Sequence, residues 1–453
     1  MKIQIELECK LETGKVNLNE IVYRADQLSE DIINQVITQI VLAYQRQVVE
    51  RLTPGHGSRE RTGLGRHKAK DGGGNLCRGR KVRRRGFREK PRCIKSKYGT
   101  LRIPLQVVEC LTCGKRYSPL LNALAIEPYA GHEDMVEKAV MDAVIDTNYR
   151  RLIDGQGIDV SLGGVHNYIA GSDIDTIMDT GMDLDDYCGV MGDGSGLKKS
   201  GGRKGEIRAL VGITDKGGLE PLGSWVDESW ERIEKEMRKR LKSQPKQPPL
   251  FLYDGEPGLE RFLEECVRGH QRCEWHGPRG LYHAMWEDGY RKQDIDPYQD
   301  KLKRVVGVSI PEEDYDKIDG EAIEDVREKY EDAKTGMVEL IDELEKKECP
   351  KAVAYLRNLV DGLFHQVELW MDTGIVAPKT TSRLERLFRE LARRLKRIAW
   401  GWSDKVATNL SKMIMIKKYT REKWEKYWLE KMGVKGNFAI WINHVKVIEC
   451  HNI

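Results

Sequence analysis

Two short apolar runs of this chain each end in Asp-Gly, and this pair constrains the fold more than any other feature. The run "YCGVMGDG" ends at Asp193, and the run "LFLYDG" ends at Asp254. Short apolar runs bounded by turn residues are typical of buried strands. Because α/β sheets commonly place their chemistry at strand ends, both carboxylates are candidate catalytic groups. An Asp before Gly is also a common turn residue, and that alternative stays open for both positions.

The elements predicted between residues 187 and 400 follow a defined order. Three strands come first, then a helix, a strand, a helix and a strand, followed by a long helical stretch and one more helix. This is the ribonuclease H-like order, in which the first and fourth strands are neighbours in the sheet. We therefore expect an α/β catalytic core with a mixed sheet, interrupted by an all-α insertion, in which Asp193 lies beside Asp254.

Carboxylates at adjacent strand ends suit divalent metal ions. Mg²⁺ is a hard cation that prefers carboxylate oxygens. Two such ions ~3.5–4 Å apart can activate a water or hydroxyl and stabilise the leaving oxygen of a phosphodiester. Two aspartates cannot fill both metal shells, so a third acid is expected on a nearby helix. Residues 380–399 predict an amphipathic helix with its N-cap at Thr381 or Ser382 and one apolar face, formed by Leu384, Leu387, Phe388, Leu391 and Leu395. Glu385 of this helix is the candidate, and Glu390, turned to another face, is its rival. An ion pair of Glu385 with Arg389 is the structural alternative.

The charges of the chain balance globally but not locally. The 453 residues carry 76 Lys/Arg and 72 Asp/Glu, for a net charge of +4. Residues 51–100 carry 17 basic against 3 acidic side chains, and residues 383–426 carry 14 against 5. Two basic blocks indicate a polyanionic partner, and solvated helix faces with a disordered arm are the alternative. No run of 18 apolar residues exists, so we expect no membrane span.

The stretch "SKYGTLRIPLQVVECLTCG" predicts two alternating strands around a Tyr-Gly turn, ending in Cys110-x-x-Cys113-Gly. Such a turn after a strand is half of a zinc ribbon. The other half is not clean, because Cys77 and Cys93 are not spaced as Cys-x-x-Cys, and His67 is a further candidate ligand. Zn²⁺ at Cys110 and Cys113, and a hairpin that keeps the turn without a metal, both stay open. The ten cysteines otherwise predict reduced thiols in a cytosolic protein.

Residues 133–171 predict a helix-turn-helix. An amphipathic helix is broken by "GQGIDV", and the next helix starts after Ser161, a good N-cap. In this motif the second helix enters the major groove of DNA, and a helical hairpin without a DNA role is the alternative. The candidate DNA contacts are Arg150, Arg151, His166 and Asn167. Arginines beside Glu385 would meet the DNA backbone, namely Arg383, Arg386 and Arg389.

The segments "GDGSG", "LYDGEPG", "CEWH" and "TTSRLERLFRELARRLK", in this order, resemble the DDE transposases of insertion sequences, and most closely the Mutator-like group. That group has an all-helical insertion before its last acid. It carries a Cys-x-x-His after its second aspartate, here Cys273 and His276, and an Asn/Ser-x-x-Glu context, here Ser382 to Glu385. The stretch "SKYGTLRIPLQVVECLTCGKRYSPL" is similar to the DNA-binding half of archaeal and bacterial transposases. The resemblance covers residues 90–420.

The resemblance implies a DNA transposase that binds terminal inverted repeats, cuts at the element ends and joins the freed 3′-hydroxyl to double-stranded target DNA. It implies Asp193, Asp254 and Glu385 as catalytic residues and as ligands of two Mg²⁺ or Mn²⁺ ions. Cys273 and His276 would be structural residues near the site, because two ligands do not make a zinc site. A homodimer or higher oligomer is implied, since two ends must be held at once. We also expect a cytoplasmic, nucleoid-associated protein of a prokaryote.

The predicted organisation has seven parts. They are an N-terminal helix and basic arm (1–92), a β-hairpin or zinc ribbon (93–132), a helix-turn-helix (133–180), the first part of the core (187–284), the helical insertion (285–372), the last part of the core with the third acid (373–430) and a C-terminal strand (431–453). Within the first part we expect a short strand pair in residues 1–20, one long helix over residues 21–52 and a Gly- and Arg-rich loop or arm over residues 53–92. Two other functions stay open. One is a non-cutting DNA-binding protein derived from a transposase, and the other is a different ribonuclease H-like nuclease.

Overall fold

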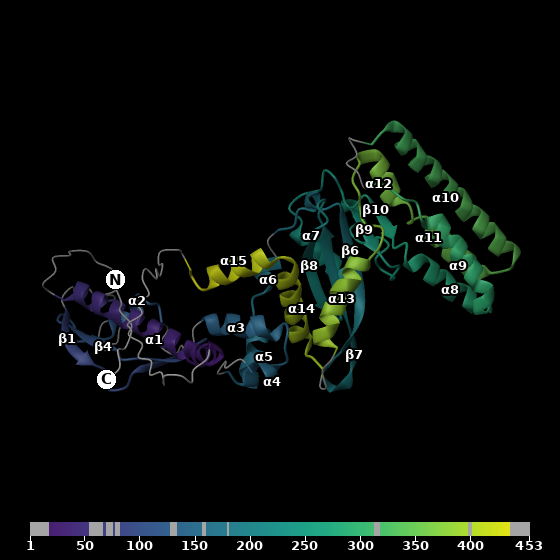
Figure 1. The fold of residues 1–453 in the computed structure, drawn as a ribbon. Coiled ribbons are helices and arrows are strands. Elements are labelled where there is room, and N and C mark those ends of the chain that lie inside the picture. Colours follow the sequence, from purple (N-terminus) through teal and green to yellow (C-terminus); the bar gives the residue numbers. More distant parts are fainter. Residues whose placement is uncertain are drawn as a thin grey trace. The chain divides into compact units, whose positions relative to one another are not determined.

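The computed structural model describes residues 18–53, 67–68, 76–77, 82–126, 134–155, 160–178, 181–311, 318–396 and 401–434. The chain divides into two compact units, Met1–Tyr168 and Ile169–Ile453 (Figure 1). The strand pair predicted within residues 1–20 and the strand predicted within residues 431–453 fall almost entirely outside the described ranges.

The first unit begins with one long helix that packs on a small antiparallel sheet. Helix α1 (Leu18–Leu52) confirms the helix predicted for residues 21–52. Strands β2 (Arg92–Ser96) and β3 (Gly99–Ile103) pair around the predicted Tyr-Gly turn, where Gly99 has a positive φ of 96°. Apolar side chains of the helix and sheet share one core, formed by Ile37, Val41, Tyr44, Ile94, Leu101, Ile103, Leu105 and Leu120.

A second sheet of the first unit has the order β1-β4-β5, with β1 (Val82–Phe87), β4 (Gln106–Cys110) and β5 (Arg116–Tyr117). The Gly- and Arg-rich composition predicted a loop or arm where β1 lies, and this prediction is wrong for residues 82–87. Only Val82 of β1 is buried, and it pairs with Cys110. A strand with one buried residue has no alternating pattern, so its pairing with β4 defines it rather than its own sequence.

Four short helices follow in the sequence: α2 (Pro119–Ala123), α3 (Asp134–Val144), α4 (Tyr149–Gly155) and α5 (Leu162–Gly171). The sequence predicted one helix where α3 and α4 stand. The chain breaks between them because Asn148 starts a new helix, with its Oδ1 accepting the N–H of Arg151 at 2.9 Å. Ser161 caps α5 as predicted, since its Oγ accepts the N–H of Gly164 at 3.1 Å. The helix-turn-helix itself stays a prediction.

The second unit is built on a five-stranded mixed sheet with the order β10-β9-β6-β7-β8 (Figure 1). Its strands are β6 (Gly189–Lys198), β7 (Lys204–Ile213), β8 (Leu219–Val226), β9 (Leu250–Tyr253) and β10 (Gly269–Arg272). The first three pair antiparallel, while β9 runs parallel to β6 and β10 parallel to β9. The predicted neighbourhood of the first and fourth strands is confirmed, because β6 and β9 are paired.

Helices cover both faces of this sheet. Helix α7 (Trp230–Arg240) packs Trp230 and Ile233 on one face, in a core that includes Val190 of β6. Helices α13 (Ser382–Leu395) and α14 (Asp404–Tyr419) contact the opposite face, as shown by hydrogen bonds from Ser411 to Ser224 (2.8 Å) and from Lys396 to Ser195 (3.0 Å). Because side chains alternate along a strand, Asp193, two residues before Ser195, faces α13.

The helix predicted between β9 and β10, from "LERFLEECVRG", is wrong. The chain forms turns there, with a single 3₁₀ turn at Glu264–Cys266. Leu263 takes a left-handed φ of 56°, which ends any helix, and its N–H donates to Glu234 of α7 at 3.0 Å. The apolar residues at helical spacing, Leu259, Phe262 and Cys266, are buried in the α7 core through these turns instead.

Five helices share a core of their own: α8 (His276–Glu287), α9 (Lys292–Val306), α10 (Gly320–Lys346), α11 (Pro350–Val360) and α12 (His365–Thr373). The group includes the stretch predicted as a helical insertion, 285–372, but begins earlier, at His276, within the segment predicted as core. Leu281, Leu302, Met337, Leu356 and Trp370 meet in that core. Gln271 of β10 joins the group to the sheet, since its Oε1 accepts the N–H of Gln366 at 3.0 Å. The remaining described helices are α6 (Asp175–Met178) and α15 (Arg421–Lys431). None of the described helices combines the length and apolar character needed to cross a bilayer.

Candidate active site

The strand register sets two of the predicted acids level with each other. In the parallel pair β6–β9, Gly189 pairs with Leu250 and Met191 with Leu252, an offset of 61 residues. Continued by two residues beyond Met191, the same offset sets Asp193 opposite Asp254. Paired residues of neighbouring strands point to the same face, so both carboxylates belong to the face that α13 covers.

Both aspartates also form local turns. The Oδ1 of Asp254 accepts the N–H of Glu256 at 2.8 Å, which closes an Asx turn, and Gly255 between them has a φ of 109°. The Oδ1 of Asp193 accepts the N–H of Gly194 at 2.7 Å. Each hydrogen bond uses a single carboxylate oxygen, so the turn alternative and a metal-binding role do not exclude each other.

The third predicted acid lies in the first turn of α13. The Oε1 of Glu385 is 3.9 Å from Nε2 of His276, and its side chain is half-buried. The rival Glu390 lies on another part of the helix surface and forms ion pairs with Arg393 (3.0 Å) and Lys418 (2.5 Å). These cations, the hydrogen bond from Lys418 first, lower the pKa of Glu390. Among the described ion pairs none joins Glu385 to Arg389.

Electrostatic interactions connect the acids through His276. Burial raises the pKa of Asp193 to about 7, with the negative charge of Asp254 as the next cause, while His276 opposes the rise. The pKa of His276 is raised, first by its contact with the Cys273 thiol and further by Asp254 and Glu385. The four side chains of Asp193, Asp254, His276 and Glu385 therefore form one interacting group.

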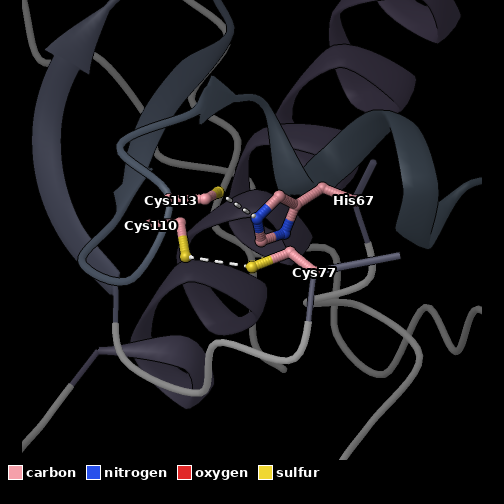
Figure 2. A group of neighbouring side chains, drawn as sticks. All are labelled: His67, Cys77, Cys110 and Cys113. Carbon is pink, nitrogen blue, oxygen red and sulfur yellow. Dashed lines mark hydrogen bonds between the residues drawn. The ribbon is translucent and has the colours of Figure 1, made fainter. Parts of the chain in front are cut away.

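The ligand atoms of Asp193, Asp254 and Glu385 do not all lie within 4.8 Å of one another among the described residues. Among the described residues, one group of His, Cys, Asp and Glu side chains has all its ligand atoms within 4.8 Å of one another, and it is His67, Cys77, Cys110 and Cys113 of the first unit (Figure 2). The predicted knuckle cysteines Cys110 and Cys113 thus have two partners there, whereas Cys93 lies exposed on β2 outside the group.

Cys273 and His276 lie beside the acids and tie three elements together. Cys273 is buried at the end of β10, and its Sγ accepts both the N–H and the Oγ1–H of Thr381 at 3.4 Å. Thr381 directly precedes α13. Thr381 is the N-cap residue of α13, one of the two positions predicted, but its hydroxyl donates to the sulfur and makes no side-chain hydrogen bond to the helix. His276 is the first residue of α8. The two hydrogen bonds from Thr381 to Cys273 fix where α13 begins and therefore where Glu385 lies.

Glu256 is a residue of the site that the sequence did not single out. Its Oε1 accepts hydrogen bonds from Trp230 Nε1 at 2.7 Å and from Arg208 Nη2 at 3.2 Å, and the Arg208 guanidinium lies 5.2 Å from the Trp230 ring centre. Glu256 contributes to the raised pKa of Asp193. Its position two residues after Asp254 was the only sequence signal that Glu256 lies near the acids. Its partners Arg208 and Trp230 come from β7 and α7, so sequence spacing could not identify them.

The predicted DNA contacts are all exposed. Arg150, Arg151, His166 and Asn167 are exposed on α4 and α5. On α13 the predicted contacts Arg383, Arg386 and Arg389 are exposed, and Arg383 donates a hydrogen bond to the backbone carbonyl of Gly217. Contact of these side chains with DNA stays a prediction.

Comparisons with known proteins find a weak likeness among solved structures. No protein-family model matches the chain, and no curated protein sequence matches it. Among solved structures, the chain is similar to the "Drosophila P element transposase strand transfer complex", with a TM-score of 0.38 and 9% sequence identity, over 64% of this chain and 92% of that chain. Similarity of this degree carries no weight for function, which depends on the residues of the site itself.

Proposed function

We propose that this chain is a DNA transposase of the DDE type with a ribonuclease H-like core, which cuts phosphodiester bonds at the ends of its element and transfers the 3′ end to target DNA. One observation carries the proposal. The register of β6 and β9 sets Asp193 level with Asp254, and both Asp254 and Glu385 act on the same histidine, His276. The strand order β10-β9-β6-β7-β8, with α13 on the face of the acids, supports the proposed core.

The chemistry of the donors fits Mg²⁺ or Mn²⁺. Asp193, Asp254 and Glu385 offer hard carboxylate oxygens, which these ions prefer. The pKa of Asp193 is raised first by burial and then by the negative charge of Asp254, and a divalent cation beside the carboxylate would offset both effects. When bound, two such ions would activate the attacking oxygen and stabilise the leaving one. Cys273 and Thr381 hold the first turn of α13, so Glu385 is positioned before any ion arrives.

The partner in this proposal is double-stranded DNA, the terminal inverted repeats and the target. Arg386 and Arg389 are exposed on α13, the helix that carries Glu385, and are suited to phosphate contacts. Two element ends must be held together for transfer, so the proposed active form contains two or more copies of the chain.

The decisive experiment is a cleavage assay with the purified full chain. The substrate is DNA that flanks the coding region, and an unrelated fragment of equal length is the control. We expect cleavage of the flanking DNA and joining of its 3′ ends with Mg²⁺ or Mn²⁺, and none with Ca²⁺ or without added divalent ions. Tight, sequence-specific binding without cleavage under every metal condition would contradict the enzyme.

A second candidate is a non-cutting DNA-binding protein derived from a transposase. It is favoured by the observation that the ligand atoms of the three acids do not all lie within 4.8 Å of one another among the described residues. In that case Asp193 and Asp254 only stabilise the local turns in which they accept backbone N–H groups. The assay above separates the two candidates, because this protein would bind the flanking DNA and leave it intact.

Replacing Cys273 by alanine tests how the third acid is positioned. The substitution removes the acceptor for two buried donors of Thr381, which should cost about 1–3 kcal/mol of unfolding free energy. With the start of α13 released, Glu385 loses its fixed position, so we expect half-maximal cleavage to need more Mn²⁺. Cys273→Ser retains an acceptor, so its stability and its Mn²⁺ requirement should lie between those of Cys273→Ala and the wild type.

Cys266→Ala is the matched control, because Cys266 is also buried but packs in the α7 core away from the acids. It should lower stability and leave the Mn²⁺ dependence unchanged. An equal change in Mn²⁺ dependence for Cys266→Ala and Cys273→Ala would show that the effect is general destabilisation.

A further inference from the structure

Four metal-binding side chains from two segments of the first unit converge on one point (Figure 2). Cys110 is the last residue of β4, Cys113 lies in the turn between β4 and β5, and His67 and Cys77 come from earlier in the chain. All four ligand atoms lie within 4.8 Å of one another. We propose that His67, Cys77, Cys110 and Cys113 bind one structural Zn²⁺ ion, which fastens the segment of His67 and Cys77 to the sheet β1-β4-β5.

The distances match a tetrahedral zinc site. With Zn–S near 2.3 Å and Zn–N near 2.0–2.1 Å, tetrahedral geometry sets two sulfurs about 3.8 Å apart and a sulfur and a nitrogen about 3.6 Å apart. Cys77 Sγ is 3.8 Å from Cys110 Sγ, and His67 Nε2 is 3.3 Å from Cys113 Sγ. Three thiols with one imidazole are the soft donor set that Zn²⁺ takes in closed structural sites.

The backbone supports each half of the site. In one half, Gly114 N–H donates to Cys110 O at 2.9 Å and Cys110 N–H donates to Lys115 O at 3.0 Å, while Gly114 has a φ of 68°. This compact turn presents both thiols on one side. In the other half, Cys77 N–H donates to His67 O at 2.9 Å, next to a bridge between Lys68 and Leu76. Both pairs of ligands are thus held before an ion binds.

The surroundings of the four side chains suit a closed site. His67 and Cys110 are buried, and the His67 ring stacks on Tyr117 of β5 with centroids 4.5 Å apart, which fixes the direction of its Nε2. A disulfide between Cys77 and Cys110 is the main chemical alternative. Its sulfurs would lie about 2.05 Å apart, far closer than the 3.8 Å found here.

The ion would hold the basic part of the first unit in place. Cys110 pairs with Val82 at the start of β1, and the three residues after Val82 are exposed arginines, Arg83, Arg84 and Arg85. The pairing of Cys110 with Val82 therefore connects a proposed metal ligand directly to β1. The zinc proposal concerns folding of the first unit and does not depend on the proposed transposase activity.

The test measures metal in the full chain. Protein is purified under reducing conditions, its zinc and iron are quantified by mass spectrometry, and the ion is then exchanged for Co²⁺. We expect about one zinc per chain, negligible iron, and a cobalt spectrum with thiolate charge-transfer bands and intense visible bands of a tetrahedral site. Protein that stays metal-free after incubation with Zn²⁺, or that contains a Cys77–Cys110 disulfide in the presence of reductant, would overturn the proposal.

Matched variants locate the ligands. Cys77→Ser and Cys113→Ser should lower the zinc content about tenfold or more, whereas Cys93→Ser, at an exposed thiol outside the group, should retain it. His67→Cys should retain the ion and strengthen the cobalt charge-transfer band, while His67→Ala should not. Loss of zinc from Cys93→Ser, or full zinc in Cys77→Ser, would show that the ligands are different. If a serine variant does not fold, Co²⁺ titration of metal-free wild-type protein still counts the thiolate ligands.

Discussion

Neutralising any one of the three acids, by Asp193→Asn, Asp254→Asn or Glu385→Gln, should reduce metal-dependent DNA cleavage by about a thousandfold or more. Each substitution removes a negative oxygen ligand and changes the side-chain volume little. Electrostatic attraction between the ion and the remaining two acids is then too weak to hold the reacting oxygens in place. DNA binding, which we propose is carried by exposed arginines and not by the acids, should change little. Cleavage rates and binding affinities measured on the same DNA separate the two effects.

Two substitutions of the same chemical type serve as controls. Asp215→Asn alters an exposed aspartate in the turn between β7 and β8. Glu390→Gln alters the rival glutamate on α13, whose carboxylate is occupied by Arg393 and Lys418. Both proteins should cleave DNA at close to the wild-type rate. Loss of activity in Glu390→Gln with retention in Glu385→Gln would assign the third acid to Glu390.

The sheet and the order of its acids could be predicted because the information is local. An apolar run of four to six residues that stops at Asp-Gly specifies both a buried strand and the residue at its end. The pairing of β6 with β9 then follows from the order of the elements and is confirmed. The amphipathic spacing of α13 was equally readable, since all five predicted core residues are buried: Leu384, Leu387, Phe388, Leu391 and Leu395.

Features that depend on distant partners could not be predicted in this way. His67, Cys77 and Cys93 were all candidate ligands from the sequence, but their spacing fits no compact motif and could not decide among them. The fold brings His67 and Cys77 to Cys110 and Cys113 and leaves Cys93 outside the group. The segment after β9 has helical spacing, yet the left-handed backbone of Leu263 and its contact with α7 select turns. Asn148, a polar residue within an apparently continuous helix, was a local signal of the break between α3 and α4 that amphipathic spacing concealed.

The same substitution that removes activity at Asp193 should make the second unit more stable. The pKa of this carboxyl is raised from 3.8 to about 7 in the folded protein, first by burial and then by the charge of Asp254. The folded state therefore holds the proton more tightly than the unfolded state. Ionisation of Asp193 therefore costs no stability below about pH 4, and it lowers the unfolding free energy progressively between about pH 4 and pH 7. Above about pH 7 the cost no longer changes with pH. The shift corresponds to at most about 4 kcal/mol.

Asp193→Asn should thus raise the unfolding free energy at pH 8 by about 1–3 kcal/mol, less than the limit because the new amide must also find hydrogen bonds. All ten tryptophans lie after residue 168, so tryptophan fluorescence during urea unfolding follows the second unit alone. The gain should be large at pH 8 and small at pH 5, in buffer without Mg²⁺ or Mn²⁺. Added Mg²⁺ should stabilise the wild type and have little effect on the variant.

Asp227→Asn provides a contrast of opposite sign. The hydrogen bond from Lys199 lowers the pKa of Asp227, so its charged form stabilises the folded state above its unfolded-state pKa and its loss should destabilise the protein at pH 8. If Asp193→Asn also destabilised the second unit at pH 8, neither burial nor the charge of Asp254 would make the charged Asp193 carboxylate unfavourable in the folded protein. The electrostatic reason for a divalent cation between β6 and β9 would then be lost, together with the main physical support for the proposed enzyme.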